Sequence, residues 1–363
     1  MIITYENAIN YLQSFLINSN VDLINQTIRG SSYFVNPIPQ YNAMLNYCNQ
    51  LDLNEKTIVE FFLLGRKVKK EAIDKLDNNL LAALEILEII KSKDDFVQLD
   101  ELILITYMAC FFFTSTPCAF PQNTSGNMNV YIGIDTYQLL NNQLNHKCNS
   151  ILDICTGNGI QLIMACKRTS AKKGLGIDIS DKSVEIAKLN CSINDMDDVI
   201  TIIKGDIYSP INNDKFDLIY SNPPYIAVPI DINYPVYGNG GSTGLEIISR
   251  ILSELSDYLS EKGQAVIYGE TLGSDNRWFI SDYIDEYLYN DFSTNLIIIN
   301  HADVATHAKR ISKIASNYNK LHSTSLKQWT DQYESIKATN HGCFILKIVK
   351  DNSNIFSHKV TTL

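Results

Sequence analysis

The sequence predicts an α/β chain built on a doubly wound, Rossmann-like sheet of seven strands, with a mainly helical domain before it. A strand, a glycine turn and a helix follow one another between residues 151 and 166, as in parallel sheets that bind a ligand at their strand ends. A later apolar run, at 216–220, is soon followed by two prolines, which cannot donate the hydrogen bonds that continue a strand. The seven strands are expected at 151–154, 174–179, 200–206, 216–220, 265–268, 295–299 and 343–349.

The glycine turn follows a strand that ends near Asp153. Thr156, Gly157 and Gly159 form a tight turn in which a ligand can approach the backbone closely, because glycine has no side chain. A nicotinamide or flavin fingerprint needs a third glycine where Leu162 stands, so the turn favours another ligand. The carboxylate of Asp153 suits a ligand that carries a positive charge.

Acidic residues end the next two predicted strands. Asp178 lies about twenty residues past the glycine turn, where a carboxylate can accept hydrogen bonds from both hydroxyls of a ribose. Asp206 ends the third strand and is placed to accept a hydrogen bond from an adenine amine. Since the carboxyl ends of parallel strands share one edge of a sheet, these residues predict a nucleoside site.

The fourth strand opens into Asn222, Pro223, Pro224 and Tyr225. The side-chain oxygen of Asn222 and the carbonyl of Pro223 can accept the two hydrogens of a planar NH2 group. The ring of Tyr225 can stack on that plane. The loop therefore predicts a site for an amide or aromatic amine whose nitrogen lone pair faces the nucleoside site.

Together these motifs resemble the class I S-adenosylmethionine (SAM) methyltransferases, and within them the HemK/PrmC branch that methylates a glutamine side-chain amide. The resemblance covers roughly residues 130 to 300 and includes a GG-x-x-GL pattern at Gly240 to Leu245, followed by Arg250. It implies SAM as the cofactor. The implied cofactor-binding residues are Asp135, Thr136, Asp153, Thr156, Gly157, Gly159, Asp178, Ile179, Asp206, Ile207 and Asn222. The implied catalytic residues are Asn222, Pro223, Pro224 and Tyr225.

The chain departs from the family pattern on the side expected to face the acceptor. The family's Glu-Pro before the double glycine is replaced here by Tyr234, Pro235 and Val236, and its Asp in GGxDGL by Thr243. The acceptor therefore stays open between a protein glutamine and a small molecule or peptide. Further alternatives are an exocyclic amine of a nucleic acid, SAM itself as the substrate of a cyclisation, and a non-enzymatic binding module.

Composition limits the possible partners and compartment. The net charge is −10 and the pI about 5.1, which argues against a nucleic-acid groove, because neutralising phosphates requires an excess of Lys and Arg. The eight cysteines show no CxxC and no His-Cys spacing typical of zinc, so no metal is predicted. The N-terminus lacks the pattern of a signal peptide, and the apolar run 102–113 is too short to span a bilayer. We therefore expect a cytoplasmic protein without membrane partners.

Helical periodicity dominates residues 1–125, which are expected to form a substrate or partner domain. Segments 96–99 and 103–113 are candidates to pair as strands, which would make this domain winged-helix-like.

A methyltransferase domain is expected over 126–363. It contains a polar helical insertion at about 304–337. Inserted loops of this length are usually functional. We expect the insertion to form a lid or substrate wall, with His307, His322, Trp329 and Tyr333 as candidate contacts.

Overall fold

The computed structural model describes residues 4–30, 40–123, 130–274, 277–289, 292–318, 325–351 and 357–362. These form two compact units. The first unit comprises Met1–Tyr137, Gly157–Ile160 and Glu185–Asp198, and the second comprises Gln138–Thr156, Gln161–Val184 and Val199–Leu363. Within the described ranges, no helix combines the length and apolar character needed to cross a membrane.

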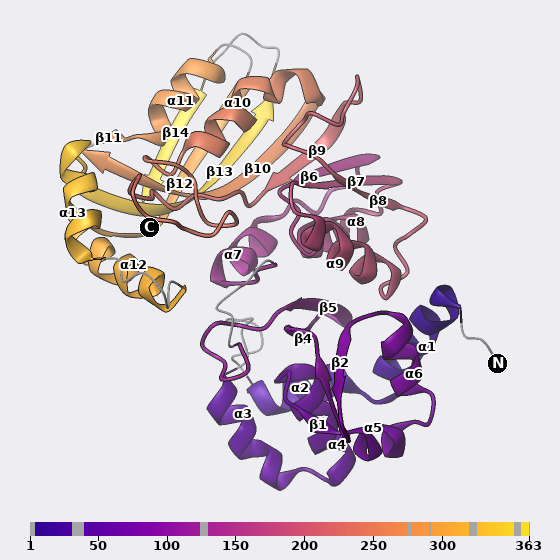
Figure 1. Cartoon of the computed structure of the whole chain (residues 1–363). Coiled ribbons are helices and arrows are strands. Elements are labelled where there is room, and N and C mark those ends of the chain that lie inside the picture. Colours follow the sequence, from indigo (N-terminus) through magenta and orange to yellow (C-terminus); the bar gives the residue numbers. More distant parts are fainter. Residues whose placement is uncertain are drawn as a thin grey trace. The chain divides into compact units, whose positions relative to one another are not determined.

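Short helices and two small sheets make up the first unit (Figure 1). The helices are α1 (Tyr5–Asn18), α2 (Val21–Arg29), α3 (Tyr41–Tyr47), α4 (Leu53–Ile58), α5 (Lys70–Leu76) and α6 (Leu80–Ile86). The strands are β1 (Val68–Lys69), β2 (Ile90–Lys93), β3 (Phe96–Leu99), β4 (Leu102–Tyr107) and β5 (Cys110–Ser115). Leucine side chains of α1, and leucine and phenylalanine side chains of β4 and β5 and of the segment Val59–Leu63, are buried, which gives this unit its own core.

The strand pairing expected in this unit was wrong. β3 pairs with β1 and β2 in an antiparallel sheet of order β1-β3-β2, not with segment 103–113. That segment instead folds back on itself as the β4–β5 hairpin. Met108 and Ala109, between the two strands, both have positive φ. Such a pair makes the two-residue turn that matches the twist of a hairpin, so the turn lies inside the apolar run and not before it.

Two asparagines bind the edge of β5. Both belong to the first unit and stand at or just after the end of α9 (Asp181–Ser192). Asn190 accepts from the backbone N–H of Phe113 at 2.8 Å and donates to its carbonyl at 3.0 Å, and Asn194 binds Phe111 in the same way. A carboxamide offers both a donor and an acceptor. These side chains therefore take the place of a neighbouring strand.

The second unit contains a nine-stranded sheet of order β14-β12-β13-β10-β9-β6-β7-β8, with β11 paired to β10 (Figure 1). The strands are β6 (Ser150–Ile154), β7 (Lys173–Asp178), β8 (Ile200–Lys204), β9 (Phe216–Ser221), β10 (Leu259–Ser274), β11 (Arg277–Trp278), β12 (Phe292–Asp303), β13 (Asn340–Lys350) and β14 (Ser357–Thr362). β6 to β10 run parallel and β13 runs antiparallel. All seven predicted strands are present, and the Rossmann-like prediction is confirmed; β11 and β14 were not expected.

One face of this sheet packs on α10 (Glu246–Tyr258) and α11 (Ile280–Tyr287). Alternate strand residues such as Leu152, Leu175 and Ile219 meet helix residues such as Ile248 and Ile284 in a single core. This follows from the period of two in a strand and of 3.6 in a helix. Other helices that contribute to this unit are α7 (Ile134–Asn142) and α8 (Ile160–Thr169).

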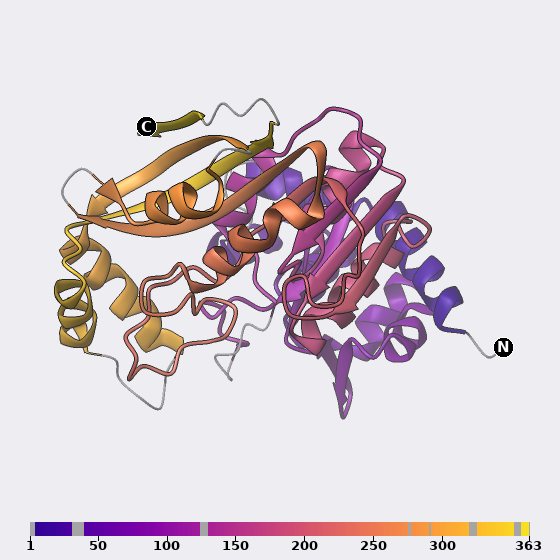
Figure 2. The same ribbon diagram turned by 90° about the horizontal axis from the view of Figure 1, so that it is seen from above.

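The insertion between β12 and β13 forms a helical hairpin, α12 (Val304–Tyr318) and α13 (Leu326–Ser335). Its apolar faces share a second core with the loop that follows β9, which lies beside these helices in Figure 2. Ile226, Val228 and Tyr234 come from the loop, and Ile311 and Trp329 from the hairpin. The insertion therefore fixes the course of the loop that begins with Asn222.

Candidate active site

Three carboxylates gather at the carboxyl ends of β6, β7 and β8. Asp153 is the penultimate residue of β6, Asp178 is the last residue of β7, and Asp206 stands two residues past the end of β8. Burial, and then the charges of Asp178, Asp153 and Asp206, raise the pKa of the Cys155 thiol well above its ordinary value. The parallel pairing of β6 with β7 and of β7 with β8 brings the three strand ends to the same edge of the sheet.

Asp153 is almost completely buried, and burial raises the pKa of its carboxyl to about 7. The nearby charge of Asp178 contributes to this rise, while a hydrogen bond from the Thr156 hydroxyl opposes it. That bond is 2.6 Å long and ends on Oδ2. A buried carboxylate with this neighbourhood favours an approaching positive charge, since a cation would stabilise its ionised form.

The turn between β6 and α8 has a backbone that only a glycine-rich sequence adopts easily. Cys155, Gly157 and Gly159 all have positive φ, at 59°, 58° and 82°. The N–H of Thr156 donates to the carbonyl of Ile177 at 3.0 Å, which ties the turn to β7. A Cβ placed on Gly157 would meet no atom of the described residues within 4 Å. The turn thus leaves open space at a backbone position that a ligand can approach.

The other carboxylates hold local partners. Oδ1 of Asp178 accepts from the N–H of Ser180 at 3.0 Å, and Oδ2 of Asp206 forms an ion pair with Arg250 at 2.7 Å. Of the residues that follow these acids, Ile179 is exposed and Ile207 is buried with φ of 53°. Arg250 was noted in the sequence only as part of the GG-x-x-GL pattern, and its link to Asp206 could not be predicted from their separation.

Asp135 and Thr136 belong to the first unit, in the first turn of α7. Both are buried, and the N–H of Gly133 donates to the Thr136 hydroxyl at 3.2 Å.

The NPPY loop, residues 222–225, is fixed at both of its ends. The hydroxyl of Ser221, just before it, donates to the carbonyl of Ile154 at 2.8 Å and joins the end of β9 to β6. Behind it, the N–H of Gly240 donates to the carbonyl of Ile226 at 3.0 Å. A Cβ on Gly240 would stand 2.8 Å from the Cα of Tyr225, and one on Gly244, whose φ is +80°, would stand 2.5 Å from its carbonyl oxygen. The GG-x-x-GL pattern therefore exists because this segment packs directly on the Tyr225 backbone.

The departures from the family pattern are explained in part by the insertion. Tyr234 is buried and its ring meets that of Trp329 edge to face at 6.2 Å. Trp329 and Tyr333, expected as candidate contacts, are fully buried in the core that α12 and α13 share with the loop. They build the wall and do not line its surface, whereas His322 lies outside the described residues.

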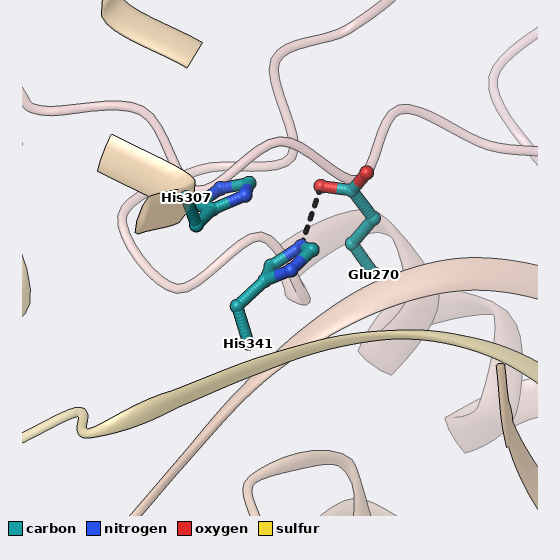
Figure 3. Close-up of side chains that lie close together, drawn as sticks. All are labelled: Glu270, His307 and His341. Carbon is teal, nitrogen blue, oxygen red and sulfur yellow. Dashed lines mark hydrogen bonds and ion pairs between the residues drawn. The ribbon is translucent and has the colours of Figure 1, made fainter. Parts of the chain in front are cut away.

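A polar cluster next to the NPPY loop was missed by the sequence analysis. Glu270 of β10, His307 of α12 and His341 of β13 converge, with one ligand atom of each within 4.8 Å of the others (Figure 3). Together with Tyr225 and Thr243 they line a depression. The one available signal was a carboxylate inside an otherwise apolar strand, at Glu270.

The strand-end carboxylates fit a cationic nucleoside such as SAM, which carries a sulfonium and an ammonium group. Asp153 would face positive charge, the open backbone at Gly157 would admit the ligand, and Asp178 would hold a ribose. These assignments stay predictions.

Comparisons with known proteins agree with this arrangement. Residues 131–272 match the family model described as methyltransferase small domain. A protein from Methanocaldococcus jannaschii that bears the name protein N5-glutamine methyltransferase is 34% identical over 142 residues, which cover 38% of this chain and 70% of that protein.

Two bacterial relatives match over a similar region. A ribosomal protein uL3 glutamine methyltransferase of Bradyrhizobium diazoefficiens is 31% identical over 121 residues, 31% of this chain and 38% of the relative. A release factor glutamine methyltransferase of Thermodesulfovibrio yellowstonii is 34% identical over 124 residues, 32% of this chain and 44% of the relative. The chain thus spans less than half the length of these two relatives. The sheet, the family match and the archaeal relative agree: the chain belongs to the HemK/PrmC-like class I methyltransferases, enzymes that depend on SAM.

Proposed function

We propose that this enzyme transfers a methyl group from SAM to the side-chain amide nitrogen of a glutamine in another polypeptide. The observation that carries the proposal is the NPPY loop, fixed at the end of β9 by Ser221 on one side and by Gly240 and Gly244 on the other. The three relatives described above bear glutamine methyltransferase names, which favours an amide over an aromatic amine.

The loop would act by orienting a poor nucleophile. An amide nitrogen reacts slowly because its lone pair is delocalised into the carbonyl. The side-chain oxygen of Asn222 and the carbonyl of Pro223 would accept its two hydrogens, and Tyr225 would stack on its plane. These acceptors stabilise the positive charge that grows on nitrogen during the transfer. Pro224 would keep the loop stiff, since its ring fixes φ.

SAM supplies an already activated methyl group on a sulfonium, so the protein mainly has to align two reactants and exclude water. Alignment of this kind contributes roughly 7 to 11 kcal/mol in favourable intramolecular reactions. No strong base is needed before the transfer, because the amide proton becomes acidic only as the new N–C bond forms. On this proposal the insertion at 304–337 forms the wall of the acceptor site, and the domain at 1–125 binds the acceptor polypeptide.

The test is methyl transfer from labelled SAM to separate pools of protein, nucleic acid and small metabolites. The expected result is label in protein, recovered as methylated glutamine after proteolysis and mass spectrometry. Label in nucleic acid or in a metabolite would contradict the proposal. Release of methylthioadenosine without any acceptor would instead indicate that SAM itself is the substrate.

A further inference from the structure

The cluster beside the NPPY loop contains a buried carboxylate whose two oxygens have different partners. Oε2 of Glu270 accepts from Nε2 of His341 at 3.0 Å (Figure 3). Oε1 has only longer contacts, to Arg310 of α12 at 3.3 Å and to the Cys343 thiol at 3.7 Å. Charge-assisted N–H···O bonds are usually 2.7 to 2.9 Å long. Oε1 is therefore the oxygen that can accept another donor.

The cluster holds one buried negative charge. Burial alone would raise the pKa of the Glu270 carboxyl. The hydrogen bond from His341, and after it the electrostatic interactions with His341, His307 and Arg310, outweigh burial and hold the pKa well below its usual range. Burial, followed by nearby positive charge, lowers the pKa of His307, so this ring is neutral. Because Arg310 can only donate, Nδ1 of His307 accepts from it at 3.3 Å, and the ring hydrogen is assigned to Nε2.

Arg310 is a loosely held cation at this position. One of its nitrogens touches both Glu270 and His307 at 3.3 Å, while about half of its side chain is exposed. A long contact from a half-exposed side chain contributes little. The guanidinium can therefore leave towards solvent if a better-placed cation approaches Glu270.

The cluster lies where an acceptor would extend past the reacting nitrogen. Glu270, His307 and His341 share one depression with Tyr225 of the NPPY loop and with Thr243. A cation at this point would meet the carboxylate of Glu270, which stabilises positive charge.

A metal ion fits the same cluster less well. The rings of His307 and His341 are stacked, with centroids 3.6 Å apart and planes within 12° of each other. Metal ligation uses lone pairs that lie in the ring planes, and one ion cannot lie in two parallel planes that are separated in this way. An ammonium or guanidinium group needs only the carboxylate and avoids that restriction.

We propose that Glu270, with the neutral His307 ring beside it, forms a subsite that binds a cationic side chain of the acceptor polypeptide close to the methylated glutamine. Arg310 occupies this subsite in the free enzyme and is displaced by the acceptor. This inference rests on the proposed glutamine acceptor and adds its sequence context: the enzyme selects a glutamine that lies near a lysine or arginine.

The test uses synthetic peptides with one glutamine, in which each flanking position in turn carries lysine or its uncharged match norleucine. At one or more positions we expect kcat/KM of the wild type to be about tenfold higher for the lysine peptide than for the norleucine peptide, which corresponds to about 1.4 kcal/mol. Glu270→Gln removes the charge and should reduce this preference to within about twofold. Asp282→Asn is the matched control, because it breaks an exposed ion pair with Arg277 outside the depression, and it should leave the preference unchanged.

A second variant covers the case in which Glu270→Gln does not fold. Arg310→Met keeps the length of a half-exposed side chain but removes the competing cation, so the preference for lysine should increase. Equal rates for lysine and norleucine at every position in the wild type, or an unchanged preference in Arg310→Met, would overturn the subsite.

A direct binding measurement tests the subsite independently of the proposed methylation of glutamine. In an NMR titration, Nα-acetyl-lysine amide should bind the wild type at least about threefold more tightly than Nα-acetyl-norleucine amide, and Glu270→Gln or Arg310→Met should change that ratio. If no glutamine peptide is methylated but this binding difference is found, the glutamine acceptor is wrong and the subsite stands. The absence of a difference, or stoichiometric Zn²⁺ binding that depends on His307 and His341, would overturn the subsite.

Discussion

Two buried carboxylates in the same sheet have pKa shifts of opposite sign. Burial and a second carboxylate raise the pKa of Asp153, at the end of β6, to about 7. Glu270, in β10, is also buried, but hydrogen-bond donors and positive charge hold its pKa low. The difference lies in their neighbours, since burial raises the pKa of both. On the proposed function Asp153 would face the cation of the cofactor, whereas Glu270 already has Arg310 at 3.3 Å.

On the proposed function, this contrast divides the sheet into a cofactor half, β6 to β8, and an acceptor half, formed by β9, β10, β13 and α12. The cofactor half has an excess of negative charge at its strand ends. The acceptor half is close to neutral within its cluster, and its Tyr225 loop is held by backbone contacts. We therefore expect substitutions in the two halves to affect different measured quantities.

The largest expected effect comes from Asn222→Ala in the acceptor half. Loss of a preorganised group that stabilises developing charge lowers kcat by about 10² to 10³ in comparable sites. The affinity for SAM, measured by calorimetry, should change far less. A variant with normal turnover would remove the role assigned to Asn222, and an equal loss in SAM affinity would place this residue in the cofactor half.

Asp178→Ala should have the converse effect in the cofactor half. Loss of the ribose contact is expected to weaken SAM binding by about tenfold or more, corresponding to roughly 1.4 kcal/mol. At saturating SAM, kcat should fall much less than it does in Asn222→Ala. Calorimetry that finds an unchanged dissociation constant for SAM would contradict the ribose assignment.

The two halves also differ in how much of them the sequence reveals. In the cofactor half each polar group stands at the end of its own strand, so Asp153, Asp178 and the glycine turn were predicted from local patterns. The cluster of the acceptor half joins Glu270 to residues 37 and 71 positions further on. No local pattern links such residues, because their meeting depends on the pairing of β10 with β13 and on the packing of α12.

Strand pairing in the first unit failed for a related reason. The apolar run 103–113 has the composition of one strand, but positive φ at Met108 and Ala109 divides it into two. Neither residue type is typical of that turn. Tertiary packing, and not turn chemistry, therefore decided the hairpin.

A pH titration of SAM affinity should sharpen the contrast further. An unfolded Asp titrates near pH 3.9, so the raised pKa of Asp153 means that its contribution to stability falls as the pH rises from about 4 to about 7. A cationic cofactor needs the ionised form. The affinity for SAM should therefore rise by about threefold to tenfold between pH 6 and pH 8, and less so in Asp153→Asn. Identical pH profiles in the two proteins, measured by calorimetry, would exclude Asp153 from cofactor binding.

The smallest expected effect concerns the cation that pairs with Asp206 in the cofactor half. Arg250 and Asp206 form an ion pair in which both side chains are about half exposed, and such pairs contribute about 0 to 1 kcal/mol to stability. Arg250→Gln should therefore shift the melting temperature very little.

The same substitution removes a positive charge near a site for a cation, so SAM should bind up to about threefold more tightly, an effect that salt would reduce. Arg277→Gln is the matched control, since Arg277 forms equally exposed ion pairs with Asp282 and Asp285 and should leave SAM affinity unchanged. If Arg250→Gln instead weakened SAM binding by tenfold or more, Arg250 would have to hold Asp206 in place for the nucleoside. The cofactor half would then depend on a compensating cation just as the acceptor half does.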